Sequence, residues 1–212
     1  MRSVVIAASN AAKDHYHRSQ VAYWNPFVLL TYADGVAWEA RHISDYLRAV
    51  RQYCTEHKVH CRYEWVIELQ GNGKPHYHVL FWLPYGFQLP KPDKSGMWTH
   101  GFSGIQAARS AVGYIVKYAT KGSNEVYALP KNCRLFGVGG GDGLERLAAH
   151  RAGLPLWLRQ MLTPTSRAKK ISHVGWLDRE SGEIFSSPFV LSWGKDPWGV
   201  VVVSISRKEN IS

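Results

Sequence analysis

The sequence predicts an α+β fold built on an antiparallel sheet. Residues 65–70 and 76–82 are rich in aromatic and β-branched residues that alternate with polar ones, and the five residues between them are turn formers. This stretch therefore predicts a β-hairpin. Two further stretches, residues 38–58 and 105–121, carry apolar residues at helical spacing. A chain of 212 residues is long enough for one full-sized core with a smaller appendage.

The remaining elements are predicted from composition and turn signals. We expect a central strand at 27–32, a long loop at 85–104, an edge strand at 133–138, a helix at 144–162 interrupted by a proline, a hairpin at 173–193 and a last strand at 199–205. Residues 1–25 give no clear pattern. We accordingly divide the chain into a domain at residues 1–138 and a C-terminal extension at 139–212.

Charge and cysteine usage narrow the class of protein. The formal net charge of +10 favours a polyanionic partner such as nucleic acid. The three cysteines are irregularly spaced, which predicts reduced thiols and a cytoplasmic setting. The apolar run after Met1 is too short for a signal peptide, and no stretch approaches the length of a membrane span, so we expect a soluble protein that does not bind membranes.

The hairpin carries a candidate metal site. Side chains two apart on a strand share a face, so His76 and His78 point the same way. If residues 71–75 form the loop, Gln70 lies opposite His76 and Glu68 lies opposite His78. Two imidazoles and a carboxylate with coordination positions left open suit a divalent ion that also holds a substrate oxygen. The alternative is that these residues simply line the solvated face of a half-buried sheet.

The stretch from Ile105 to Lys121 carries a second candidate group. At about 100° per residue, Tyr114, Lys117, Tyr118 and Lys121 share one side of the predicted helix, away from its aliphatic side. Two tyrosines flanked by cations make a possible pair of nucleophiles. They could equally be boundary aromatics covered by lysine side chains.

The order and spacing of these motifs resemble those of a known family. A strand at 27–32, Glu68 leading to His76-Tyr77-His78, and then Tyr114-x-x-Lys117-Tyr118-x-x-Lys121 resemble the His-hydrophobe-His endonucleases that start rolling-circle DNA replication. The nearest likeness is to the two-tyrosine initiators of single-stranded DNA phages. The resemblance covers about residues 27–138.

The resemblance implies a ferredoxin-like or RRM-like sheet with the metal site on its central strands. It implies that His76, His78 and Glu68 hold Mg²⁺ or Mn²⁺ and that Tyr114 and Tyr118 are the nucleophiles. A tyrosine hydroxyl has an ordinary pKa near 10, so we expect Lys117 and Lys121 to favour the phenolate. The expected product is a 5′-phosphotyrosine and a free 3′-OH. The expected partners are single-stranded DNA at a replication origin and a host helicase and polymerase.

Three other interpretations are considered. A transposase or plasmid relaxase would use the same chemistry. A non-catalytic RRM-like nucleic-acid-binding protein would bind without forming a covalent adduct. A structural zinc site at His76 and His78 is disfavoured because no cysteine is spaced to complete it.

Overall fold

We analysed a computed structural model of the whole chain. It describes residues 1–69, 73–108, 110–121, 129, 133–172, 174–195 and 201–207, with the side chains at 118–121, 190–195, 201–205 and 207 left aside. The chain divides into two compact units, Met1–Gly153 and Leu154–Ser212, which are taken separately below. Among the described residues, no helix is both long and apolar enough to cross a bilayer.

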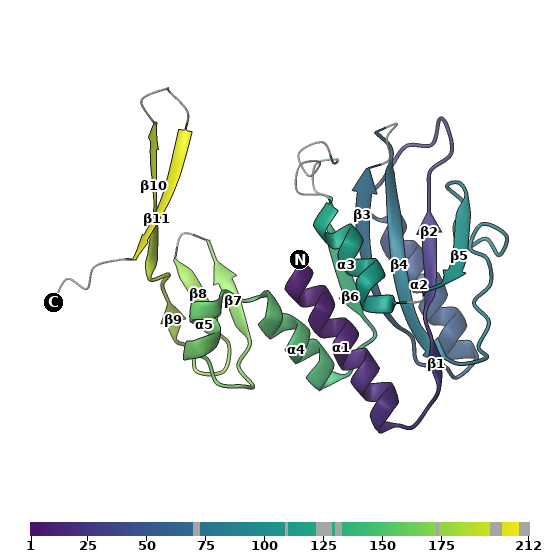
Figure 1. Cartoon of the computed structure of the whole chain (residues 1–212), viewed down its shortest axis with the longest axis horizontal. Helices are drawn as coiled ribbons and strands as arrows, with labels where there is room; N and C mark the ends of the chain where they lie inside the picture. Colours follow the sequence, from purple (N-terminus) through teal and green to yellow (C-terminus); the bar gives the residue numbers. More distant parts are fainter. Residues whose placement is uncertain are drawn as a thin grey trace. The chain divides into compact units, whose positions relative to one another are not determined.

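The first unit is built on one antiparallel sheet with helices on both faces (Figure 1). Its elements are α1 (Arg2–Arg18), β1 (Tyr23–Trp24), β2 (Pro26–Leu30), α2 (His42–Glu56), β3 (Arg62–Leu69), β4 (Pro75–Pro84), β5 (Ser103–Ala107), α3 (Ala111–Lys121), β6 (Phe136–Gly139) and α4 (Gly143–Gly153). The strand order is β5-β2-β4-β3-β6, and β1 pairs with the end of β4. The predicted α+β fold is confirmed.

The four strands β2 to β5 have the arrangement of a ferredoxin-like sheet. Strands β2 and β3 are joined through α2 and lie on either side of β4, which is antiparallel to both, as in a split βαβ unit. Strand β5 lies outside β2. The connection from β4 to β5, residues 85–102, contains no helix. It is nevertheless ordered, because Trp98 is buried and its indole N–H donates a hydrogen bond to the carbonyl of Thr31 at 2.9 Å.

One face of the sheet is purely a packing surface. Strand residues on this face, among them Val28, Tyr77 and Phe81, pack against apolar residues of α2 such as Tyr46 and Val50. The apolar residues of α2 recur at helical spacing, which is why the sequence predicted this helix. The face contains the hydrophobe between the two histidines, Tyr77, as the alternation of the strand requires.

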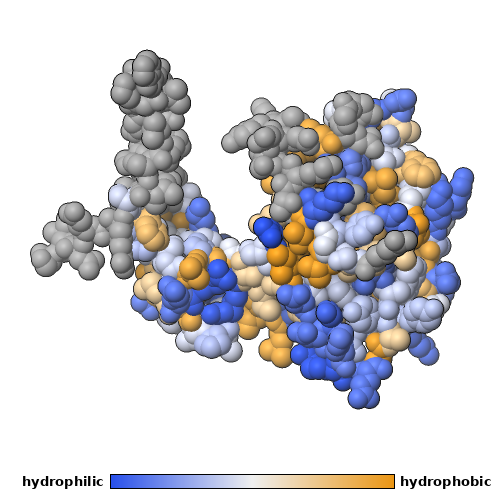
Figure 2. All heavy atoms as spheres, in the orientation of Figure 1, coloured by the Kyte–Doolittle hydropathy of each residue, from blue (hydrophilic) through white to orange (hydrophobic). Residues whose placement is uncertain are grey.

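Helices α1 and α3 lie over the opposite face of the sheet (Figure 1). Val5, Ala12 and Tyr16 of α1 and Ile115 of α3 are buried there against β3 and β4. In the space-filling view, hydrophobic residues gather where the first half of α1 runs beside α3, and hydrophilic residues gather over its second half (Figure 2). This is the face that carries the histidines.

Two sequence predictions were wrong in this unit. The predicted helix at 105–121 begins only at Ala111, because residues 103–107 pair with β2 as strand β5. The free edge of β2 offers hydrogen bonds that local helical spacing does not reveal. Helix α1 was missed, although Val5, Ser9, Ala12 and Tyr16, its buried residues, recur at intervals of three and four.

The second unit contains a short helix and two small sheets. Its elements are α5 (Leu156–Met161), β7 (Ala168–Ile171), β8 (Gly175–Asp178), β9 (Ile184–Phe185), β10 (Phe189–Lys195) and β11 (Val201–Arg207). Strands β7, β8 and β9 form one antiparallel sheet, and β10 pairs with β11. The predicted helix at 144–162 is two helices, α4 and α5, separated at Pro155, where the sequence predicted an interruption.

A buried ion pair attaches α4 to the sheet. The Nε atom of Arg62 donates to both carboxylate oxygens of Glu145 at 3.0 Å, and the two side chains are 5% and 7% exposed. Glu145 also accepts a hydrogen bond from the backbone N–H of Asp142, whose side chain accepts one from the backbone N–H of Glu145. This reciprocal pair is a capping box at the start of α4.

We predict that Arg62→Met lowers the free energy of unfolding by about 3 kcal/mol, because it leaves the Glu145 carboxylate buried without its cation. The matched control is Arg48→Met. Arg48 pairs with Asp45 at 3.0 Å, but the two side chains are 69% and 43% exposed, so its loss should change stability by less than about 0.5 kcal/mol. Urea unfolding of both variants measures this, and equal losses would contradict the assignment.

A second buried carboxyl lies on β3. Glu64 is 2% exposed and accepts a hydrogen bond from the indole N–H of Trp82 at 3.1 Å. Burial raises the pKa of Glu64 from its ordinary value of 4.5 to about 8. The folded protein therefore keeps this proton at pH values where the unfolded chain has lost it.

This pKa predicts a pH dependence of stability. A carboxyl whose folded pKa is raised contributes stability that is fully present below about pH 4.5 and is lost as the pH rises through about 8. We expect the melting temperature of Glu64→Gln, which cannot ionise, to fall less between pH 5 and 8 than that of the unchanged protein. Thermal scans across this range test it; parallel curves for the two proteins would show that Glu64 titrates normally.

Candidate metal and tyrosine site

The register of the β3–β4 hairpin brings Glu68, His76 and His78 together. Glu68 lies directly opposite His76, and Val66 lies opposite His78. The predicted register, with Glu68 opposite His78, was therefore wrong by two residues, because Pro75 is the first residue of β4 and pairs with Leu69. A shift of two residues keeps every side chain on its face. All three candidate ligands accordingly remain on the same side of the sheet.

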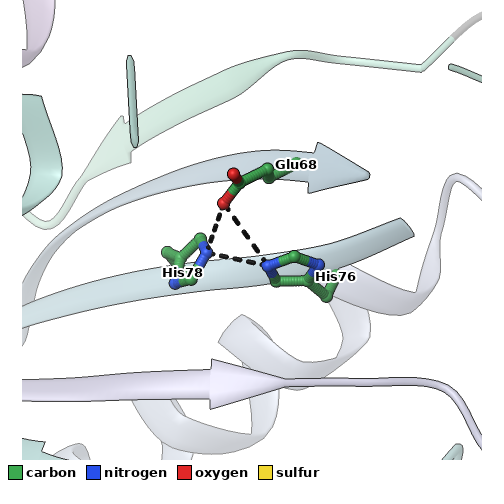
Figure 3. Close-up of side chains that lie close together, drawn as sticks. All are labelled: Glu68, His76 and His78. Atoms are coloured by element: carbon green, nitrogen blue, oxygen red, sulfur yellow. Dashed lines mark hydrogen bonds and ion pairs between the residues drawn. The ribbon is translucent and has the colours of Figure 1, made fainter. Parts of the chain in front are cut away.

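The three side chains point at a common position (Figure 3). The Nε2 atoms of His76 and His78 are 2.9 Å apart, Nε2 of His78 is 2.9 Å from Oε2 of Glu68, and Nε2 of His76 is 3.5 Å from that oxygen. The side chains are between 6% and 10% exposed. The group is thus largely shielded from bulk water.

These distances fit three ligands of one metal ion. Ligand atoms about 2.1 Å from an ion lie about 3.0 Å apart at right angles and about 3.4 Å apart at the tetrahedral angle. The observed spacings of 2.9 to 3.5 Å span this range. Two imidazoles and one carboxylate on one side of an ion leave its other positions open for water or substrate. The donor set therefore fits Mg²⁺ or Mn²⁺ in a site that remains accessible.

A depression of about 190 Å³ opens beside His78. It is lined by residues of β2, β4 and β5, namely Phe27, Leu29, His78, Gly104, Ile105 and Gln106. Helices α1 and α3 cover the neighbouring strands β3 and β4 instead. One edge of the group of ligands is thus open to a bound molecule.

Tyr114 lies on the same face of the sheet as the histidines. The ring of Phe27 stacks on the ring of His78, with centroids 5.5 Å apart, and contacts the ring of Tyr114 edge-on at 5.3 Å. Tyr114 is half-buried against this cluster. It therefore does not point away from the core, as the helical wheel predicted, because α3 contacts the sheet along two adjoining sides of the helix.

The other predicted residues of α3 are placed less completely. The side chain of Lys117 is exposed. Tyr118 and Lys121 belong to α3 by their backbone, but their side chains lie outside the described residues.

Sequence reasoning missed the part played by Phe27. It was assigned only to a buried strand, yet it is the side chain that contacts both His78 and Tyr114. Its position opposite Leu80 in the β2–β4 ladder could have indicated its face once the pairing was known. Sequence alone does not specify which strands pair.

Tyr77 can be set aside as a nucleophile. It lies between the two histidines in sequence but on the opposite face, where its hydroxyl accepts a hydrogen bond from the indole N–H of Trp38 at 2.7 Å. Burial raises its pKa to about 12. Its phenol therefore stays protonated at neutral pH.

Comparison with known proteins gives one match. Residues 25–123 match a family model described as replication-associated protein ORF2. All seven candidate residues, from Glu68 to Lys121, fall inside the matched segment. The curated proteins and the solved structures gave no match. The match supports a role in initiating DNA replication.

We predict that Mn²⁺ stabilises this protein through Glu68, His76 and His78. At a metal concentration of 100 times Kd, binding to the folded state adds about 2.7 kcal/mol. The melting temperature should therefore rise with Mn²⁺ in the unchanged protein but not in Glu68→Gln. Glu56→Gln, which removes an exposed carboxylate elsewhere, should keep the full increase. A Glu68→Gln variant that still responds like the unchanged protein would exclude Glu68 as a ligand.

Proposed function

We propose that this protein initiates rolling-circle DNA replication by nicking and rejoining single-stranded DNA through a phosphotyrosine intermediate. The observation that carries the proposal is the convergence of Glu68, His76 and His78 on the sheet face against which Tyr114 packs. The match of residues 25–123 to a replication-associated family supports it. The net charge of +10 suits a nucleic-acid substrate.

Each residue has a distinct part in the proposed reaction. Glu68, His76 and His78 hold Mg²⁺ or Mn²⁺, which when bound would polarise the scissile phosphate and stabilise charge on its oxygens. Phe27 packs between His78 and Tyr114 and so sets the position of the tyrosine ring relative to the ligands. A position fixed by packing reduces the entropy lost when nucleophile and phosphate meet.

The strand transfer exchanges one ester for another. The phenol oxygen of Tyr114 or Tyr118 attacks the scissile phosphorus and forms a new P–O bond. The bond from phosphorus to the 3′ oxygen breaks, and the 3′ oxygen takes up a proton as it leaves. Lys117 and Lys121 would favour loss of the phenol proton and balance the phosphate charge. The free 3′-OH can prime a host polymerase behind a host helicase, and the second tyrosine can accept the strand that closes the circle.

We expect purified protein with Mn²⁺ and single-stranded origin DNA to form a covalent complex that survives SDS. Tyr114→Phe with Tyr118→Phe should abolish the complex. His76→Ala should reduce it at least about 100-fold while leaving much of the DNA binding, since loss of a metal ligand removes charge stabilisation worth several kcal/mol. Denaturing gels with end-labelled DNA measure both effects.

The control is Tyr85→Phe. Tyr85 is 76% exposed and lies in the β4–β5 connection, so its hydroxyl should be dispensable. A complex that persists in the double tyrosine variant would overturn the assignment of the nucleophiles. DNA binding that survives EDTA with no adduct under any condition would instead identify a non-catalytic RRM-like binding protein.

A further inference from the structure

The three-stranded sheet of the second unit has two unlike faces. Ala168, Trp176 and Phe185 are on one face and pack with Leu158 of α5 in a small hydrophobic cluster. Because side chains alternate along a strand, their neighbours lie on the other face. That face carries Lys169 and Leu177, which are paired across the ladder, and Ile184, which pairs with Leu177. Helix α5 does not cover it.

Two arginines extend this second face. The backbone N–H of Arg179 donates to the carbonyl of Arg167 at 3.0 Å, which continues the β7–β8 ladder by one pair beyond Ala168 and Asp178. Arg167 and Arg179 therefore lie directly opposite each other, on the same side as Lys169. All three side chains are exposed. We call Arg167, Lys169 and Arg179 the cationic face.

The nearby carboxylates do not neutralise the cationic face. Asp178 is on the buried side, where the backbone N–H of Glu180 and the hydroxyls of Ser166 and Ser181 donate to it at 3.1 Å. These hydrogen bonds, that of the Glu180 N–H above all, lower the pKa of Asp178. Glu180 itself accepts a hydrogen bond from Thr165. Both carboxylates are engaged in the β8–β9 turn and its surroundings.

Nor do ion pairs engage the three cations. Within the described part of the chain, the ion pairs of lysine and arginine side chains involve Arg41, Arg48, Arg62, Lys74 and Lys91. Like charges directly opposite each other on a sheet are destabilising. An arginine pair at such a position is relieved by an anion that binds between the two side chains. The repulsion therefore indicates an anionic partner.

The apolar residues on the same face suit a nucleic acid. Leu177 is half-buried, and Ile184 is 51% exposed beside it. Cations that contact phosphates, with apolar side chains between them that contact sugars or bases, are the combination that binds single strands without sequence preference. Two apolar residues make a small area for insertion into a membrane, so the charge decides the choice.

We propose that the cationic face of the second unit is a second DNA-binding surface, separate from the metal and tyrosine site, that contacts the phosphate backbone of single-stranded DNA irrespective of sequence. The choice of DNA among polyanions rests on the function proposed above. The surface itself rests on the register of β7 and β8. It would hold the strand that flanks the nick.

Two adjacent lysines provide a matched test. Lys169 and Lys170 are both exposed on β7 and carry the same charge, but Lys170 lies on the other face, opposite Trp176. Lys169→Gln should weaken binding of the full chain to an oligothymidine about fivefold at 0.1 M salt, since each lost contact to a single strand lowers the salt dependence by about 0.7 in log–log slope. Lys170→Gln should leave the affinity unchanged within twofold.

The triple variant Arg167→Gln, Lys169→Gln, Arg179→Gln enlarges the effect. It should bind about 100-fold more weakly, with a log–log salt slope smaller by about 2. Binding is measured by fluorescence anisotropy in EDTA, so the result does not depend on metal or on nicking. Its melting temperature should not fall, because the variant removes repulsion and no buried contact.

Three outcomes would overturn the proposal. Equal effects of Lys169→Gln and Lys170→Gln would show that only net charge matters. Unchanged binding by the triple variant would show that the face does not contact DNA. Loss of binding to vesicles containing phosphatidylserine, with DNA binding intact, would show that it contacts membranes instead. Failure of the proposed function has a different signature, since His76→Ala or a lack of adduct leaves binding to oligothymidine at this face unaffected.

Discussion

The pairing of β3 with β4 is the constraint on which the candidate site depends. Glu68 and His76 face each other across this ladder, and His78 reaches the same carboxylate from the next position on its face. A slip of one residue would turn Glu68 to the α2 face and bring Ile67 or Leu69 in its place. The apolar residues of the other face, packed against α2, oppose such a slip because it would expose them. Core packing on one face thus maintains the ligands on the other.

The two faces of the sheet have separate tasks. The α2 face is closed by Trp98 and the β4–β5 connection and is devoted to packing. The opposite face contains both apolar packing and buried charge, with Glu64 and the Arg62–Glu145 pair toward β6 and the ligand group toward β5. Phe27 links these features to α3, since its ring touches His78 and Tyr114. A chain of aromatic contacts, rather than a hydrogen bond, relates the tyrosine to the ligands.

The second unit repeats this division on a smaller scale. One face of β7-β8-β9 is closed by α5, and the other is exposed and cationic. Asp178 is the residue that keeps the two apart, because its carboxylate organises the β8–β9 turn and is unavailable to the arginines. A surface that retains opposed like charges is consistent with selection for binding rather than stability.

The sequence by itself determined the elements whose signals are local: the hairpin at 65–82, the helix packed through Ile43 to Cys54, the interruption at Pro155, and the common face of His76 and His78, which follows from the period of a strand. Tertiary structure alone decided the rest. The exact register, strand β5, and the contacts of Tyr114 and Phe27 depend on which edges and faces meet, and α1 and the Arg62–Glu145 pair depend on partners far away in the chain. Such long-range pairings satisfy backbone hydrogen bonds and bury charge, and a local pattern carries no record of them.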